Sequence, residues 1–120
     1  MRRKPGALLP LEQAICASAD ALRRHGVTEF HGYELAKHLA HDSERQLLTA
    51  YGTLYRALGR LETMGMLQSR REDPAISARE NRPGRRLYTL TTAGEAAARE
   101  AVAGWREKAP RRTRRRVAPA

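Results

Sequence analysis

The stretch from residue 49 to residue 65 reads TAYGTLYRALGRLETMG, and it decides the fold expected of the whole chain. Apolar side chains recur at positions 54, 57, 58, 61 and 64, which is the spacing of one face of an α-helix. Thr49 can cap the start of this helix, and Gly65 can end it. We therefore expect a helix near 50–64 with one buried face and one polar face.

The opposite face and the start of this helix carry the candidate DNA-binding residues. They are Thr49, Tyr51, Thr53, Tyr55, Arg56 and Arg60. A helix fits the major groove of B-DNA, where arginine can donate two hydrogen bonds to guanine and hydroxyl groups can hold phosphates. The pattern predicts a DNA-reading helix. Other interpretations are that the arginines are solvated or pair with Glu62 or Glu34, and that the tyrosines border the core.

Two helices are expected before the reading helix. The first runs near 11–25, where apolar residues recur at helical spacing: Leu11, Ile15, Ala19 and Leu22. The second is short, near 32–40, and residues 41–48 are expected to form the turn that leads into the reading helix.

After Gly65 the pattern changes from helical to extended. Residues 67–72 and 86–90 are expected to pair as a two-stranded hairpin, joined by a long loop rich in Pro, Asn, Gly and Arg. The loop and second strand carry Arg79, Arg82, Arg85 and Arg86, which we expect to contact DNA as a wing. Arg70 and Arg71 on the first strand are expected to be neighbours only.

A last helix is expected to open at a capping box formed by Thr92 and Glu95 and to run to about Trp105. Its apolar side is lined by Ala97, Ala101, Val102 and Trp105. This side and that of the first helix are expected to hold a homodimer. Trp105 and Val102 are the candidate dimer residues, and Trp105 could also stack on an effector.

These elements predict a mainly α fold with a small β-hairpin, a winged helix-turn-helix with a C-terminal dimerisation helix. Residues 1–10 are expected to be a basic arm, 11–90 the DNA-binding domain, 91–107 the dimerisation helix, and 108–120 a disordered basic tail. The formal net charge is +10, and residues 45–86 together with the two ends of the chain carry the excess. Such a distribution is typical of a protein that binds a polyanion.

Composition and motifs argue against several other classes. No apolar run approaches the roughly 18 residues of a membrane span, and the single cysteine, Cys16, fits a reducing cytoplasm. No phosphate-binding loop or nucleophile elbow is present, so no catalysis and no cofactor are expected. A metal site was considered at His38 and His41, with His31, Asp42 and Glu44 nearby. No tetrahedral set is completed there, and no metal is expected.

Several strings, in this order along the chain, resemble the PadR family of transcriptional regulators. They are FHGYELA at 30–36, GTLY at 52–55, RLE at 60–62, RPGRRLY at 82–88 and LTTAG at 90–94. The resemblance implies a homodimeric winged-helix repressor of double-stranded DNA, relieved by a small aromatic ligand. It assigns reading roles to Tyr51, Thr53, Tyr55 and Arg60, and wing roles to Arg82, Arg85 and Arg86. The role of Arg56 and the long wing tip at 73–81 are not part of it.

Two functions from other classes remain open at this point. A chain with a pI near 11.0 and basic ends could bind RNA in a ribosome-associated role, although it lacks an aromatic platform for single strands. It could also be a winged-helix adaptor between proteins, with the tail alone holding nucleic acid.

Overall fold

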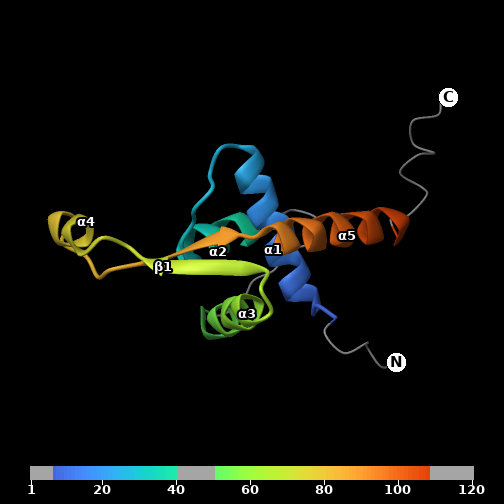
Figure 1. The fold of residues 1–120 in the computed structure, drawn as a ribbon, viewed down its shortest axis with the longest axis horizontal. Coiled ribbons are helices and arrows are strands. Elements are labelled where there is room, and N and C mark those ends of the chain that lie inside the picture. Colours follow the sequence, from blue (N-terminus) through green and yellow to red (C-terminus); the bar gives the residue numbers. More distant parts are fainter. Residues whose placement is uncertain (1–6, 41–50, 109–120) are drawn as a thin grey trace.

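The computed structural model describes residues 7–40 and 51–108. Within these ranges the elements, shown in Figure 1, are α1 (Pro10–Arg24), α2 (Gly32–Ala40), α3 (Tyr51–Thr63), β1 (Leu67–Arg71), α4 (Pro74–Arg79), β2 (Arg86–Leu90) and α5 (Thr92–Lys108). The fold class is confirmed: helices dominate, and a single antiparallel hairpin follows α3. The predicted second helix at 32–40 has the bounds of α2.

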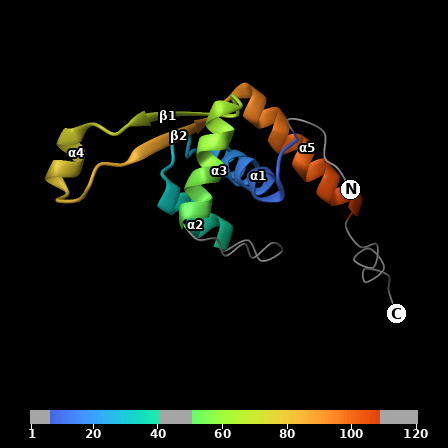
Figure 2. The ribbon, with the colours of Figure 1, turned by 90° about the horizontal axis from the view of Figure 1, so that it is seen from below.

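Helix α1 lies at the centre of the helical part and packs against α2, α3 and α5. The hairpin leaves this body on one side and carries α4 at its far end, while α5 extends on the other side (Figures 1 and 2). The strands join the body near Leu67 and Leu90, and the bridge from Phe30 to Tyr88 and the ion pair of Arg70 with Glu29 hold the hairpin farther along its length. None of the described helices is long and apolar enough to cross a membrane.

The expected apolar face of the reading helix is confirmed. Leu54, Leu58 and Leu61 are fully buried and Ala57 nearly so. They belong to one hydrophobic core with residues from the neighbouring elements, among them Ile15, Leu35, Phe30, Leu67 and Tyr88. Burial of a leucine side chain stabilises a fold by about 1.5–3 kcal/mol, so this face contributes most of the attachment of α3 to the body.

Helix α1 contributes a free cysteine to the same core. Cys16 is buried. Burial, together with the negative charge of Glu12, raises the pKa of the thiol to about 11. Cys16 is therefore a neutral packing residue at physiological pH, as a small buried hydrophobe would be.

The hairpin pairs Leu67 with Leu90, Ser69 with Tyr88 and Arg71 with Arg86. Residues directly opposite each other share a face, so these six lie on one side of the sheet. Leu67, Tyr88 and Leu90 are buried, which shows that this side faces the core. An isolated bridge joins Phe30 to Tyr88, and their rings stack with centroids 6.0 Å apart.

The prediction of a loop at the wing tip is wrong in one respect, because this segment contains the helix α4. Asp73 caps this helix by accepting a hydrogen bond from the Ala75 amide at 2.9 Å, and Pro74 occupies its first turn. Asp followed by Pro is a common helix start. Proline is also typical of loops, and here it lies in the first turn of a helix.

The capping box expected at Thr92 and Glu95 is also wrong, by one residue. Thr91 caps α5: its Oγ1 accepts the Gly94 amide at 3.0 Å and donates to the Gly65 carbonyl at 2.6 Å. Glu95 instead forms an ion pair with Arg23 of α1, with 3.6 Å between Glu95 Oε2 and Arg23 Nε. The helix continues to Lys108, beyond the expected end near Trp105.

Gly94 explains why α5 can start where it does. A Cβ atom at this position would overlap the Met66 carbonyl and lie 2.6 Å from Leu90 Cδ1. Only glycine therefore lets the first turn of α5 approach the backbone at the base of the hairpin.

The apolar sides of the first and last helices, which the sequence predicts to hold a homodimer, are partly buried within the chain itself. Helices α1 and α5 pack against each other within one chain. Gly94, Ala98 and Ala101 are buried on α5, and Ile15 is buried on α1. Much of each apolar side is thus covered without a partner, because small residues on α5 let α1 approach closely.

Candidate nucleic-acid interface

The exposed face of α3 presents the predicted reading residues to solvent. Thr53, Tyr55 and Arg56 are exposed, and Arg56 Nη2 donates to Thr53 Oγ1 at 3.3 Å. Tyr51 begins the helix, but its side chain lies outside the described part of the structure, as does Thr49, the expected cap. A hydroxyl and a guanidinium thus lie together near the start of α3, and the phenol of Tyr55 flanks that face.

Two strings that are distant in the sequence meet beside this face. A Cβ atom on Gly32 would lie 2.8 Å from Tyr55 Cε1, so the ring of Tyr55 rests directly on the start of α2. Tyr33 and Tyr55 are the exposed large hydrophobic residues of the described part, at 56% and 46%. Gly32, in the first of these strings, therefore leaves the space that the ring of Tyr55, in the second string, occupies.

His31 caps α2, and its ring stacks on the ring of Tyr33. Its Nδ1 accepts the Glu34 amide at 3.3 Å, and its ring lies parallel to that of Tyr33, with centroids 6.3 Å apart. Burial, then the charges of Arg85 and Arg82, lower the pKa of His31. The lowered pKa favours the neutral imidazole, whose Nδ1 can accept this hydrogen bond.

An open groove of about 500 Å³ separates this aromatic group from the wing. His31, Tyr33 and Tyr55 line one side, and residues 82–86 line the other. The groove brings the predicted helix residue Tyr55 together with the predicted wing residues Arg82, Arg85 and Arg86.

Arg60 has a different environment from the other reading residues. Its Nε donates to Glu12 Oε2 at 2.8 Å, and the Glu12 side chain is only 1% exposed. The second carboxylate oxygen accepts the Leu9 amide at 2.8 Å. Arg60 thus ties α3 to α1. Its partner is Glu12, whereas the sequence suggested Glu62 or Glu34.

Arg82 is likewise held within the wing. It donates two hydrogen bonds to Glu72, at 2.6 and 2.8 Å, and one to Glu80 at 2.7 Å. The side chain of Arg82 is 17% exposed and that of Glu72 only 8%. These bonds lower the pKa of Glu72 to about 2 and raise that of Arg82. Arg82 closes the base of the wing tip, with little surface left for a ligand.

Arg85 and Arg86 remain exposed on the wing. The Arg85 amide donates to Glu72 at 3.2 Å, so the closed tip also fixes its backbone. Arg86 Nη1 donates to Ser69 Oγ at 2.9 Å, and Ser69 donates to Glu62 of α3 at 2.6 Å.

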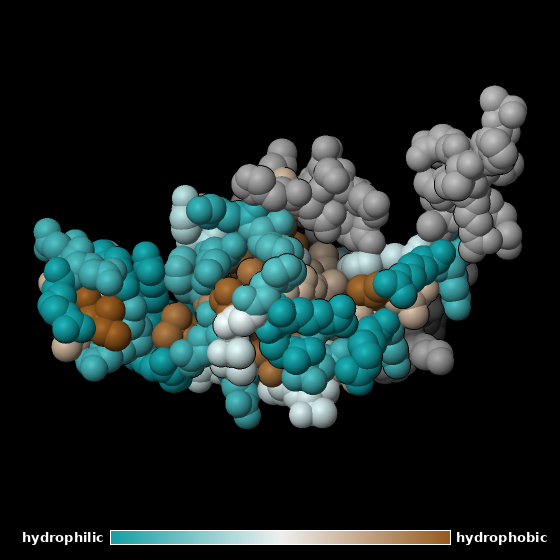
Figure 3. Space-filling model, turned by 90° about the horizontal axis from the view of Figure 1, so that it is seen from above, coloured by the Kyte–Doolittle hydropathy of each residue, from teal (hydrophilic) through white to brown (hydrophobic). Residues whose placement is uncertain are grey.

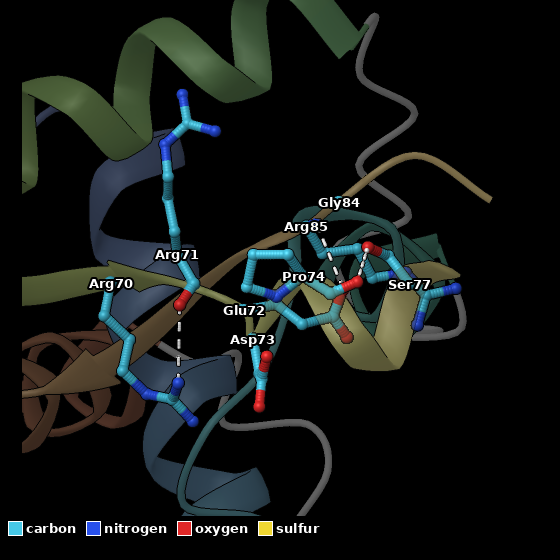
Figure 4. Close-up of a pocket in the computed structure, with 8 residues that line it drawn as sticks. All are labelled: Arg70, Arg71, Glu72, Asp73, Pro74, Ser77, Gly84 and Arg85. Carbon is cyan, nitrogen blue, oxygen red and sulfur yellow. Dashed lines mark hydrogen bonds between the residues drawn. The ribbon is translucent and has the colours of Figure 1, made fainter. Parts of the chain in front are cut away.

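Arg71 is a candidate that the sequence interpretation missed. Figure 4 shows that Arg70 and Arg71 extend to opposite sides of β1. Arg70 forms a two-bond ion pair with Glu29, whereas the guanidinium of Arg71 has no acidic partner among the described residues. Arg71 and Arg85 line an open cavity of about 510 Å³ at the base of the wing tip. The register of the hairpin distinguishes the two arginines, and only the alternation of side chains along β1 signals it in the sequence.

The remaining candidates lie away from this side. Val102 and Trp105 are half-buried on α5. Among described residues no three metal-ligating side chains come together, and His41, Asp42 and Glu44 lie outside the described ranges. The face of the molecule in Figure 3 is hydrophilic over most of its described surface, with small hydrophobic groups such as the one at α4.

Comparisons with known proteins agree with this architecture. A transcriptional regulator from Clostridium thermocellum has a TM-score of 0.61 at 17% identity, covering 91% of this chain and 96% of its own. A PadR family transcriptional regulator from Eggerthella lenta has a TM-score of 0.55 at 26% identity, covering 80% and 76%. The circadian clock associated protein Pex from Anabaena has a TM-score of 0.55 at 24% identity, covering 83% and 80%.

No curated protein matches the chain significantly. The model of the "Transcriptional regulator PadR-like family" matches residues 22–100, which include α2, α3, the wing and the first half of α5. A match over most of the chain, on the helices and hairpin that form the candidate interface, shows that this protein belongs to the PadR-like family of transcriptional regulators.

Proposed function

We propose that this protein binds double-stranded DNA sequence-specifically, with α3 in the major groove and the wing on the adjoining backbone. The observation that carries the proposal is the groove between α3 and the wing. Its walls pair exposed tyrosines with exposed arginines, and Arg56 and Thr53 are also exposed on α3. Arg56 is the residue we assign to base contact, because its partner is a hydroxyl and no acid among the described residues forms an ion pair with it.

The same proposal includes a homodimeric repressor that a small aromatic ligand releases from DNA. Its support is the family and the half-buried pair Val102 and Trp105 on α5. A large aromatic next to small alanines suits both an anchor between two chains and a plane for stacking. A two-fold protein matches a two-fold site, so the operator should be an imperfect palindrome with half-sites about one helical turn apart.

Selection of bound duplexes from a random pool tests the proposal, followed by competition with structured RNA. A recurrent palindromic sequence and weak competition by RNA are the expected results. Arg56→Ala should relax one base position and weaken operator binding by about 1–3 kcal/mol. A uniform loss on all duplexes would assign Arg56 to a phosphate, and equal binding of RNA would contradict the DNA-binding function.

A further inference from the structure

The α3-facing side of the hairpin brings two positive charges together. Arg71 and Arg86 are directly opposite each other in the register, and both are exposed. Side chains at such positions start about 4.5–5.5 Å apart, and like charges there are destabilising. No acidic side chain in the described part of the chain forms an ion pair with either one. An uncompensated pair of this kind favours an anion that both arginines can contact.

The geometry of Arg86 is set by the reading helix. Ser69 lies on the same side of the hairpin, accepts from Arg86 at 2.9 Å, and donates to Glu62 on α3 at 2.6 Å. This relay of Glu62, Ser69 and Arg86 is a connection between α3 and the outer part of the wing. It restrains one of the two guanidinium groups before any ligand is present, which reduces the entropy lost on binding.

We infer that Arg71 and Arg86 form a binding site for one phosphodiester group of duplex DNA, with Ser69 and Glu62 as its positioning residues. The inference rests on the proposed function and adds a phosphate site on the side of the wing nearest the major-groove helix. Arginine binds phosphate oxygens through a planar set of donors, and two arginines in register can contact two oxygens of one group. The occupant is the DNA backbone because α3, on the same side, is the element assigned to the groove.

Arg70 supplies a matched control for Arg71. The two residues are adjacent on β1, and each alanine substitution removes one positive charge at nearly the same distance from a bound duplex. They differ in the side of the sheet on which they lie, and Arg70 is already paired with Glu29. Long-range attraction therefore predicts equal effects, whereas a built phosphate site predicts unequal ones.

The experiment measures affinity of the full chain for an operator duplex, selected as above, across a series of salt concentrations. Arg71→Ala should weaken binding roughly tenfold and reduce the slope of log affinity against log salt by about one per chain. Arg70→Ala should change the affinity less than threefold. Thermal unfolding of each variant checks that the fold is retained.

The positioning residues are tested by substitutions whose charge effect has the opposite sign. Glu62→Ala removes a negative charge, so simple attraction predicts tighter DNA binding, whereas loss of the relay predicts weaker binding. Glu62→Gln keeps an acceptor for Ser69 and should bind at least as well as the wild type. Ser69→Ala should weaken binding a few-fold, and Ser69→Thr should restore it.

Each result has a defined meaning. A wild-type chain that binds no duplex would overturn both the proposed function and this site. A wild type that binds normally, with equal losses for Arg71→Ala and Arg70→Ala, would overturn the site alone. Tighter binding by Glu62→Ala would remove Glu62 and Ser69 from the positioning role.

Discussion

The reading helix and the wing are held on this protein by different forces. Helix α3 places four apolar side chains in the core, three of them fully buried. The outer wing has no such core: its tip is closed by Arg82 with Glu72 and Glu80, and its sides are tied by Arg70 with Glu29 and Ser69 with Glu62. Apolar burial is insensitive to pH and to moderate salt, whereas exposed ion pairs are sensitive to both. The two elements that we propose to contact DNA should therefore respond differently to the same conditions.

The largest effect expected from this contrast is in the core under α3. Leu58→Ala should destabilise the protein by about 2–5 kcal/mol, because Leu58 is fully buried and its removal leaves a cavity. Leu87→Ala, on the half-buried strand β2 of the wing, should cost far less. Urea unfolding of both variants makes the comparison, and equal losses would show that the wing shares the main core.

The next effect concerns Arg60, which joins α3 to α1 through an ion pair with Glu12. Arg60→Ala leaves the buried Glu12 carboxylate without its charged partner, which should cost about 1–3 kcal/mol. Unfolding of Arg60→Ala, Glu12→Ala and the double variant gives the coupling energy of the pair. Operator selection with Arg60→Ala separates the two roles: an unchanged sequence preference means a tie between helices, and a relaxed base position means a base contact.

Acid should loosen the wing before it loosens the body. Glu72 has a pKa near 2 in the folded protein against an ordinary value of 4.5, and Arg70 lowers the pKa of Glu29 in the same way. Their contribution is complete above about pH 4.5 and is lost as the pH falls from there toward 2. Hydrogen exchange is measured at pH 6 and at pH 3 and corrected for intrinsic rates. On acidification, α4 and the two strands should lose more protection than α3 does.

A variant gives the control for this pH effect. Glu72→Gln cannot form the charged pair, so its wing tip should exchange faster at pH 6 and change less between pH 6 and pH 3. Equal acid sensitivity in the wild type and in Glu72→Gln would mean that another group governs the tip.

The smallest effect on stability is expected at the contact between Gly32 and Tyr55. Gly32→Ala places a methyl group against the end of the Tyr55 ring, which can turn away because the ring is 46% exposed. Unfolding should change little, whereas DNA binding should weaken by about 0.5–1.5 kcal/mol if Tyr55 donates a hydrogen bond to DNA. Gly94→Ala is the contrasting variant, because its new methyl group meets a backbone carbonyl that cannot turn away, and it should lose stability.

The sequence predicted those parts of the fold in which one residue pattern determines one element. The apolar spacing of α3, the bounds of α2 and the alternation in the strands all act locally. The helix α4 and the cap at Thr91 were missed because Asp73-Pro74 fits a loop as well as a helix start, and because Thr91 and Thr92 are both possible caps.

The candidate site was less accessible from the sequence because charged residues there differ only in their partners. Arg60, Arg70 and Arg82 meet acids that are 48, 41 and 10 residues away in the sequence. Apart from Glu80, two residues from Arg82, little in the local sequence distinguishes them from Arg56, Arg71 and Arg85. The arginine-rich composition predicts a cationic surface, and only the tertiary structure divides it into residues that hold the fold and residues left for a ligand.

The buried thiol of Cys16 provides a native probe of how this fold opens. With a pKa near 11 and no solvent exposure, it should react with a thiol reagent only after α1 separates from its neighbours. The labelling rate at a fixed pH then reports the population of open molecules, without an introduced dye or a mutation. Measured with and without operator DNA, this rate would show whether a duplex held by α3 and the wing also slows the opening of the helix behind them.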